Sequence, residues 1–515
     1  MPALAVGDRR WSVDAAAAAV RRTALQLSAQ GLAPGDVVLR AADDPLHLVL
    51  LQHALVEVGA GLLPHPPGLT AAERHALCAA VGAEWRWRRG GLARTGCRRE
   101  AGPLADRTAP ALLIRTSGSG GMPKVVMLTA PQLAASAARV NAALDLGAGD
   151  EWLCVLPLHH IGGLAIGWRC AAAGATLRLL GNAAAPALPV DDAHAGDGQA
   201  ALDPSDISAD LSDGGGVAAV QGGFQAEAVA AALARHPVTH LSLVPTMLAR
   251  LLEVMPAPPP RLRVLLLGGQ ALHPALARRA LRAGWPLHVS YGMSETGSMV
   301  AVGPWRDGAG PGARVGPPLP DMMLDCAGPA EPPRPLRLHG PMLMAGYADA
   351  ARRPGRGLAD GWLTTGDLCR LDADGALRVL GRADELVVIG GEQVSPSAVE
   401  AKLAAAPGVR EVAVVAVAHP HWGATLAACW SGPAAPAVLD AWCRDRLPSR
   451  QRPRIFRRLD ALPLLASGKP DRAALTRLAA ASDAATPNRP GTQCVDAKGK
   501  DAHEYGDKYG DGNHI

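Results

Sequence analysis

The chain has 515 residues, of which 49% are hydrophobic and 19% charged, and its formal net charge is +4. This length exceeds one ordinary domain and the apolar fraction supports a large core, so two to four globular domains are expected. The small charge and the lack of a Lys/Arg block speak against a nucleic-acid partner. Nine scattered cysteines without CxxC spacing argue against a disulfide framework or a zinc site. With no secretory leader and no run of roughly 20 apolar residues, we expect a cytoplasmic protein without a membrane span.

Helical and strand patterns alternate along the first 270 or so residues. Helices are expected over 13–32, 46–58, 131–144, 164–173, 226–235 and 246–254. Strands are expected over 37–39, 62–63, 111–114, 152–156, 241–244 and 264–267. This alternation predicts an α/β fold with largely parallel sheets. Residues 182–223, rich in Ala, Asp, Gly and Pro, interrupt the pattern and predict a surface insertion or a mobile loop.

The character of the chain changes after about residue 311. Short apolar runs with tight turns, such as Asp372-Ala373-Asp374-Gly375, predict a β-rich subdomain up to about residue 380. Strands over 386–389 and 412–416 and helices over 397–405 and 436–446 then predict a separate α+β domain. The tail 483–515 has almost no aliphatic residues, so we expect it to be disordered.

Lysine is scarce in this chain, with only six lysines among 51 basic residues, and three of the six lie in the last eighteen positions. The other three are Lys124, Lys402 and Lys469, and the first and last of these lie in Gly/Pro-rich loops. Arginine carries a planar guanidinium, whereas lysine carries a compact ammonium on a flexible aliphatic chain, so the two are not interchangeable. Chance retention would explain one lysine, but two in such loops predict phosphate chemistry.

The first of these loops is Thr116-Ser117-Gly118-Ser119-Gly120-Gly121-Met122-Pro123-Lys124. Its hydroxyls and glycines allow backbone N–H groups to converge on an anion, and the lysine adds a mobile charge. It is not a Walker A loop, because Pro123 directly precedes the lysine and no Ser or Thr follows it. Most Gly/Ser-rich loops are linkers, so this loop alone does not decide a function.

Two further segments place polar groups after apolar runs. In Tyr291-Gly292-Met293-Ser294-Glu295-Thr296, a carboxylate beside hydroxyls suits Mg²⁺ with open positions for phosphate oxygens, and Tyr291 offers a face to a purine. In Trp362-Leu363-Thr364-Thr365-Gly366-Asp367, the aspartate follows a turn glycine and can accept both hydroxyls of a ribose. Taken alone, each segment is also consistent with an ordinary turn.

Two more motifs complete the series, namely Gly381-Arg382-Ala383-Asp384-Glu385, with Gly390-Gly391-Glu392 after it, and Ser467-Gly468-Lys469. In this order the motifs resemble the adenylate-forming superfamily, which comprises acyl-CoA synthetases, nonribosomal adenylation domains and luciferases. The resemblance spans about residues 10–478. It implies an α/β fold with a large N-terminal domain, 1–383, of two helix-flanked sheets and a β-barrel subdomain. A small mobile α+β domain, 384–482, is expected to follow a hinge at Asp384.

The resemblance implies a role for each matching residue. Lys469 would contact the substrate carboxylate and the α-phosphate, Lys124 the ATP phosphates, and Glu295 the Mg²⁺ ion, with Thr296 near the phosphate. The residues implied to bind the nucleotide are Thr116, Ser117, Gly118, Ser119 and Gly121 for the phosphates, Gly268, Gly269, Gln270, Tyr291 and Gly292 around the adenine, and Asp367 and Arg382 at the ribose.

The implied chemistry is physically consistent with these residue types. A carboxylate that attacks an α-phosphate brings negative charges together, and preorganised cations and N–H donors lower that barrier. A closing domain that carries Lys469 would keep water from the acyl adenylate, and its withdrawal would admit a thiol. The chain departs from the family loop at Gly120, where Ser or Thr is usual, and at Val125, where Gly is usual. One phosphate-binding hydroxyl is therefore expected to be lost and the loop to be stiffer.

Two segments bear on the acid and the acceptor. Pro157-Leu158-His159-His160-Ile161-Gly162-Gly163-Leu164 resembles the acid-pocket motif of acyl-CoA ligases, with His160 as the substrate-binding histidine, although a core histidine is the alternative. The segment 390–396 resembles that of o-succinylbenzoate–CoA ligases and related aryl or medium-chain ligases, and Gly391 would line the pantetheine tunnel. The short N-terminal region also resembles that of the menaquinone-pathway ligases.

Three functions are consistent with these motifs. The first is an acid–CoA ligase that uses ATP, Mg²⁺ and CoA, most like o-succinylbenzoate–CoA ligase, and a homodimer is left open. The second is an adenylating enzyme that loads a separate carrier protein, since no carrier-like Asp-Ser-Leu sequence occurs here. The third is a nucleotide-binding relic without activity, which Gly120, Val125 and the unusual tail favour and the intact Glu295 and Lys469 oppose.

Overall fold

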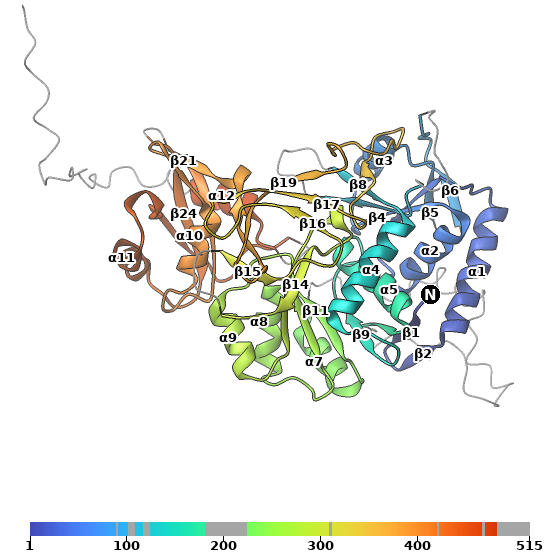
Figure 1. The fold of residues 1–515 in the computed structure, drawn as a ribbon, viewed down its shortest axis with the longest axis horizontal. Coiled ribbons are helices and arrows are strands. Elements are labelled where there is room, and N and C mark those ends of the chain that lie inside the picture. The colour runs from blue at the N-terminus through green and yellow to red at the C-terminus, as the bar shows by residue number, and fades with distance from the viewer. Residues whose placement is uncertain are drawn as a thin grey trace, which may run out of the picture.

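The structure is a computed structural model that describes residues 1–88, 91–100, 109–116, 124–180, 224–307, 312–419, 422–465 and 469–481. The predicted insertion 182–223 and the predicted disordered tail 483–515 lie outside the described residues. The described chain forms several sheets with helices packed on them. The C-terminal elements, residues 383–481, gather at one end of the molecule (Figure 1).

A seven-stranded sheet carries the loop 116–124. Its strand order is β18-β8-β7-β4-β3-β5-β6, with parallel pairing from β7 to β5 and antiparallel pairing at both ends. The strands are β3 (Val37–Ala41), β4 (Gly61–His65), β5 (Trp85–Arg88), β6 (Gly91–Arg94), β7 (Leu112–Arg115), β8 (Val125–Leu128) and β18 (Gly346–Tyr347).

An eight-stranded sheet has the order β14-β13-β12-β11-β9-β10-β1-β2, and only its edge strands β2 and β14 run antiparallel to their neighbours. Its continuous apolar strands are those of a sheet buried on both faces. The strands are β1 (Ala3–Val6), β2 (Arg9–Trp11), β9 (Glu151–Cys154), β10 (Thr176–Leu179), β11 (His240–Leu243), β12 (Val264–Leu267), β13 (Leu287–Tyr291) and β14 (Ala301–Pro304).

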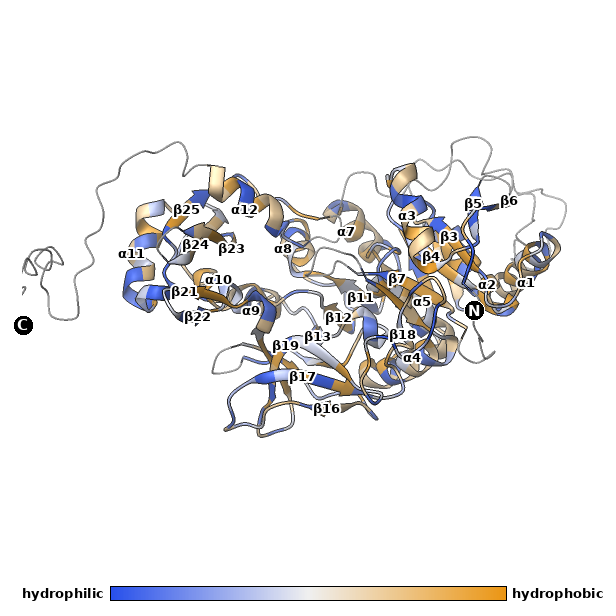
Figure 2. Ribbon diagram, turned by 90° about the horizontal axis from the view of Figure 1, so that it is seen from above, coloured by the Kyte–Doolittle hydropathy of each residue, from blue (hydrophilic) through white to orange (hydrophobic). Residues whose placement is uncertain are grey.

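Helices join these two sheets into one core. Leu62 on β4, Leu133 on α4, Leu164 on α5 and Trp152 on β9 belong to one buried cluster, so the helices lie between apolar sheet faces, and β3 and β4 are coloured as hydrophobic in Figure 2. The helices are α1 (Val13–Ala29), α2 (Pro45–Val58), α3 (Ala71–Val81), α4 (Ala130–Leu144), α5 (Ile161–Ala173), α7 (Ala226–Arg235), α8 (Pro245–Val254) and α9 (Pro274–Arg282).

The predicted β-rich subdomain is a five-stranded antiparallel sheet of order β15-β20-β19-β17-β16. The turn 372–375 joins β19 to β20 as expected, with Gly375 N–H donating to the carbonyl of Asp372 at 2.9 Å. In this strand order β15 and β16 are the two edges. The strands are β15 (Ala313–Gly316), β16 (Met323–Asp325), β17 (Arg334–His339), β19 (Leu363–Leu371) and β20 (Leu377–Arg382).

The C-terminal unit is a small α+β domain whose main sheet is covered on both faces. Val414 on one face packs with Leu403 of α10, and Val415 on the other packs with Leu475 of α12, as strand alternation requires. The elements are η4 (Ala383–Glu385), β21 (Val387–Ile389), β22 (Glu392–Val394), α10 (Pro396–Leu403), β23 (Glu411–His419), β24 (Gly423–Ser431), α11 (Pro436–Arg446), η5 (Ser449–Gln451), β25 (Ile455–Arg458) and α12 (Arg472–Ala481).

The predicted α/β class is confirmed, and so are the expected helices and strands to within a few residues. Elements such as α3, α9 and β10 were not predicted from the sequence, and neither was β8, residues 125–128. These four apolar residues are buried, and they pair antiparallel with β7 across the loop. No described helix is both long enough and apolar enough to cross a bilayer.

Candidate active site

The predicted nucleotide motifs meet at one edge of the eight-stranded sheet. The segments 268–270 and 291–296 follow β12 and β13, which are parallel neighbours, so both segments emerge at the same carboxyl edge. The Tyr291 hydroxyl donates to Asp367 Oδ2 at 2.5 Å, which links this edge to β19 of the five-stranded sheet. Gly292 lies in the turn directly after β13.

Asp367 and Arg382 face each other across the β19–β20 pair. Arg382 Nη1 donates to Asp367 Oδ1 at 3.2 Å, and its Nε and Nη2 donate to the two oxygens of Asp384 at 2.7 and 2.6 Å. The hydrogen bonds that Arg382 donates to Asp384, more than the charge of Asp367, raise the pKa of Arg382. The predicted hinge residue is therefore tied to a predicted ribose-binding residue by a bidentate ion pair.

The phosphate-loop prediction is only partly within the described residues. Ser117, Gly118, Ser119 and Gly121 lie outside them. The two flanks meet, because Thr116 N–H donates to the carbonyl of Lys124 at 2.8 Å and its hydroxyl donates to the same carbonyl at 3.3 Å. Thr116 and Lys124 are thus held together at the adjoining ends of two buried, antiparallel strands, β7 and β8.

Glu295 lies in a single 3₁₀ turn, η3 (Ser294–Thr296), after β13. Its Oε1 accepts a hydrogen bond from the Tyr347 hydroxyl at 2.8 Å, and its carbonyl accepts from Met344 N–H at 2.7 Å. Lys124 Nζ lies 4.7 Å from the centroid of the Tyr347 ring. Thr296 is fully buried, and its hydroxyl donates to the carbonyl of Met293 at 3.1 Å.

Glu295 is chemically suited to Mg²⁺. This ion usually takes one or two protein carboxylates, with substrate phosphates and waters at its other positions. No group of three or more His, Cys, Asp or Glu residues able to hold a metal occurs within the described parts of the chain. A metal shared between Glu295 and a bound triphosphate fits this donor set, whereas an all-protein cage does not.

Lys469 reaches this edge from the C-terminal domain. A side-chain carbon placed on Gly269 would lie 3.6 Å from Cε of Lys469, so the lysine stem lies directly beside the segment 268–270. Lys469 as a whole residue is exposed, but burial of its ammonium lowers the pKa of this group. The charge of Asp367 raises the same pKa, and the charge of Arg382 lowers it. The ammonium is therefore within electrostatic reach of the pair Asp367–Arg382.

His160 marks the N-terminal end of α5 and approaches the same ammonium. Burial and then the charge of Lys469 lower the pKa of His160. The rings of His159 and His160 have centroids 4.3 Å apart, and burial lowers the pKa of His159 to about 4. Both side chains are thus neutral at pH 7, and the uncharged His160 ring lies within electrostatic reach of Lys469.

Gly391 lies in the turn of the β21–β22 hairpin, where both Gly390 and Gly391 have positive φ. No atom lies within 4 Å of the position that a side chain on Gly391 would occupy. Gly390 N–H donates to the carbonyl of Trp422 at 3.3 Å, and Arg454 lies 5.7 Å from the Trp422 ring centroid. The open glycine turn thus contacts the backbone of Trp422, whose ring lies near the Arg454 guanidinium.

Tyr347, which touches both Glu295 and Lys124, was not predicted from the sequence. A signal was present, because the chain has only four tyrosines and two of them lie in the tail. The other two, Tyr291 and Tyr347, each donate to a carboxylate of the site. Tyrosine is as scarce in this chain as lysine, so its few positions could have been singled out in the same way.

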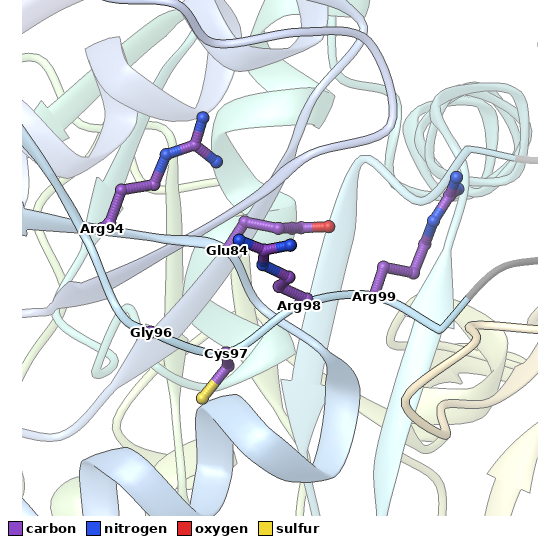
Figure 3. Close-up of a pocket in the computed structure, with 6 residues that line it drawn as sticks. All are labelled: Glu84, Arg94, Gly96, Cys97, Arg98 and Arg99. Atoms are coloured by element: carbon purple, nitrogen blue, oxygen red, sulfur yellow. The ribbon is translucent and has the colours of Figure 1, made fainter.

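A separate cavity of about 590 Å³ lies on the β5–β6 side of the seven-stranded sheet (Figure 3). Its lining residues are Glu84, Arg94, Gly96, Cys97, Arg98 and Arg99. None of the predicted site residues lines it. Glu84 is paired with the buried Arg352, and the Arg94 guanidinium lies 3.7 Å from the Trp85 ring centroid.

This fold and this site define the class of adenylate-forming enzymes. Residues 1–195 and 207–348 match the family of AMP-binding enzymes, and residues 398–469 match the AMP-binding enzyme C-terminal domain. The chain is 31% identical over 375 residues to 2-succinylbenzoate–CoA ligase of Enterococcus faecalis, which covers 71% of this chain and 69% of that protein. It is 32% identical over 391 residues to sulfoacetate–CoA ligase of Cupriavidus necator, covering 72% of this chain and 67% of that protein.

A solved relative gives the same result for the fold. The o-succinylbenzoate–CoA synthetase of Bacillus subtilis, bound to its acyl-adenylate intermediate, superposes with a TM-score of 0.72 at 26% identity and covers 92% of this chain and 94% of its own. The same synthetase has been solved with ATP and magnesium. The chain therefore belongs to the AMP-binding enzyme family, as an AMP-forming acid–CoA ligase with a large N-terminal and a small C-terminal domain.

Proposed function

We propose that this protein joins o-succinylbenzoate, or a closely related aryl or medium-chain acid, to CoA in an ATP- and Mg²⁺-dependent reaction, and that it serves menaquinone biosynthesis. The observation that carries the proposal is the position of Lys469 beside Gly269, within electrostatic reach of Asp367, Arg382 and His160. A single lysine thus neighbours the predicted adenine, ribose and acid subsites. The similarity to several 2-succinylbenzoate–CoA ligases supports the choice of acid.

In the first half-reaction, the acid carboxylate attacks the α-phosphorus of ATP and pyrophosphate leaves. Lys469 is proposed to sit between the two anions and to stabilise the charge that develops on the α-phosphate oxygens. Lys124, with the loop 116–121, would hold the departing phosphates, and Glu295 would hold Mg²⁺, with Thr296 behind it. When bound, Mg²⁺ supplies neutralising charge to the triphosphate.

The nucleoside would lie along the edge formed by residues 268–270 and 291–292. Its ribose hydroxyls would meet Asp367, whose Oδ2 and Oδ1 already accept from Tyr291 and Arg382. A carboxylate held from two sides cannot rotate freely, so little ordering remains to be done when the ribose binds. His160, neutral at pH 7, would border the acid without attracting a second carboxylate electrostatically.

The second half-reaction transfers the acyl group to a thiol after the C-terminal domain turns about Asp384. The Asp384–Arg382 ion pair would be the contact that this rotation strains first. Gly391, with open space at its side-chain position, would then border the pantetheine. Trp422 and Arg454, next to the same hairpin, offer a ring and a cation to the nucleotide end of CoA, and this favours CoA over a carrier protein.

The decisive experiment measures pyrophosphate release across a panel of carboxylic acids, with and without CoA, together with the products. We expect o-succinylbenzoate to give acid-dependent pyrophosphate and, with CoA, the thioester. Adenylate formation without thioester would favour loading of a carrier protein. No acid-dependent pyrophosphate with any acid would favour a nucleotide-binding relic, and efficient turnover of sulfoacetate alone would overturn the assigned acid.

A further inference from the structure

Tyr347 touches the two charged groups that are proposed to hold the triphosphate. Its hydroxyl donates to Glu295 Oε1 at 2.8 Å, and the ammonium of Lys124 lies 4.7 Å from its ring centroid. We propose that Tyr347 is a positioning residue that couples the phosphate-loop lysine to the magnesium carboxylate, so that both are aligned before MgATP binds. The inference rests on the proposed function, because it takes Lys124 and Glu295 as the groups that meet the nucleotide and its metal.

The backbone places Tyr347 beside the end of the phosphate loop. Tyr347 is the second residue of β18 and pairs with Val126 of β8, the strand that begins directly after Lys124. Ala348 N–H donates to the carbonyl of Val125 at 2.8 Å, which fixes the register of this pairing. Any movement of the loop end is therefore transmitted to the tyrosine by the sheet.

The ring is also held from behind, by Gly357. A side chain on this glycine would overlap the Tyr347 ring, and Gly357 has a φ of +87°, a conformation that disfavours other residues. Tyr347 N–H donates to the carbonyl of Arg356 at 2.8 Å, so the segment 355–357 follows the tyrosine closely. The ring consequently has one defined position against which the Lys124 ammonium can lie.

The hydroxyl orients only one oxygen of Glu295. Oε1 accepts from Tyr347, and no hydrogen bond or ion pair to Oε2 is found within the described part of the chain. The Met344 N–H bond to the Glu295 carbonyl fixes the backbone of the same residue. This leaves Oε2 as the oxygen that can face a divalent cation.

The two contacts differ in how they respond to substitution, and this allows them to be tested separately. Tyr347→Phe keeps the ring beneath Lys124 but frees the Glu295 carboxylate. Tyr347→Leu removes both contacts. A purely structural role would weaken all kinetic constants or lower stability without separating the requirement for metal from that for ATP.

The test uses the full-length protein and two readouts. Mn²⁺ is titrated into protein loaded with a non-hydrolysable ATP analogue and followed by electron paramagnetic resonance. The Mg²⁺ dependence of pyrophosphate release gives the second readout. For Tyr347→Phe we expect the Mn²⁺ dissociation constant and the half-saturating Mg²⁺ concentration to rise about tenfold, as for a lost hydrogen bond to a charged group, with KM for ATP within about threefold of wild type. Tyr347→Leu should in addition raise KM for ATP.

Unchanged metal titrations in Tyr347→Phe would overturn the inference. An equal loss in the Lys402→Ala control, whose ammonium donates to Gln451, would overturn it as well. If Tyr347→Phe fails to fold, Gly357→Ala tests the same point, because it keeps the hydroxyl but displaces the ring, and the same metal shift is expected. If wild-type protein releases no pyrophosphate with any acid, the proposed function fails, while the Mn²⁺ titration still decides the role of Tyr347.

Discussion

Lys469, in the C-terminal domain, lies with its side-chain stem beside Gly269, in the turn after β12 of the N-terminal domain. The two residues are 200 positions apart in the sequence, and they meet because the small domain is seated over the carboxyl edge of the eight-stranded sheet. This seating brings the ammonium near Asp367, Arg382 and His160 at once. The proposed activation of the acid requires a cation in such a position.

Removal of the Lys469 ammonium should abolish adenylation while ATP binding persists. Lys469→Ala is expected to lower the rate of acid-dependent ATP–pyrophosphate exchange by at least about 100-fold, because one preorganised charge at the developing oxyanion is typically worth that much. ATP binding measured by calorimetry should change only modestly. Lys402→Ala is the matched control and should behave as wild type. A normal exchange rate in Lys469→Ala would remove this residue from the mechanism.

The same lysine should set the alkaline limit of the first half-reaction. Burial lowers the pKa of Lys469, and the protonated form is the charged one. Activity should therefore be lost as pH rises, and at a lower pH than for a solvent-exposed lysine. The pH profile of kcat/KM for ATP–pyrophosphate exchange measures this limit. Lys469→Arg, whose charge persists to higher pH, should move the alkaline limb of its residual activity upward.

Glu295→Gln should raise the Mg²⁺ requirement. The amide keeps the size of the side chain and can still accept from Tyr347, but it lacks the negative charge that a hard cation prefers. We expect the half-saturating Mg²⁺ concentration to rise by about tenfold or more, with protein stability close to wild type. An unchanged metal titration would refute the role given to Glu295.

Asp367→Asn should weaken nucleotide binding more than Tyr291→Phe does. The aspartate accepts from both Tyr291 and Arg382, and its loss leaves the guanidinium with Asp384 alone near the ribose. Hydrogen bonds to charged groups contribute about 1.5–3 kcal/mol, so KM for ATP should rise roughly 10- to 100-fold in Asp367→Asn. Tyr291→Phe removes one of the two partners and should give a smaller increase. Equal effects in steady-state kinetics would contradict this order.

The buried His53 of α2 should make the protein less stable in mild acid. Burial lowers the pKa of His53 to about 4, against 6.5 for an unperturbed histidine. Below pH 6.5 the unfolded chain takes up a proton that the folded chain refuses, so the free energy of unfolding decreases as pH falls from 6.5 to 4. The loss is up to about 3 kcal/mol for this residue. Urea unfolding across this range should show a flatter pH dependence in His53→Phe, and an unchanged slope would contradict the assignment.

Much of the fold was predictable because its local patterns are strong. The helix 131–144 has an amphipathic pattern and a Thr129–Gln132 capping box, and the structure places it at Ala130–Leu144. β8 was missed for the opposite reason, since its four apolar residues after a Gly-rich loop have no period that separates a strand from the approach to a helix. Only pairing with β7 decides its state.

At the candidate site, too, some features follow from the sequence and others only from the tertiary structure. The sequence by itself determined which residues were candidates for the site, because scarce lysines in Gly-rich loops and spaced Asp, Glu and Arg motifs are local facts of the chain. The tertiary structure alone decided that Tyr347 lies between Lys124 and Glu295, and that Lys469 lies beside Gly269. The physical reason is that such contacts depend on sheet pairing and domain seating, which are set by burial of distant apolar surfaces and leave no trace in local spacing.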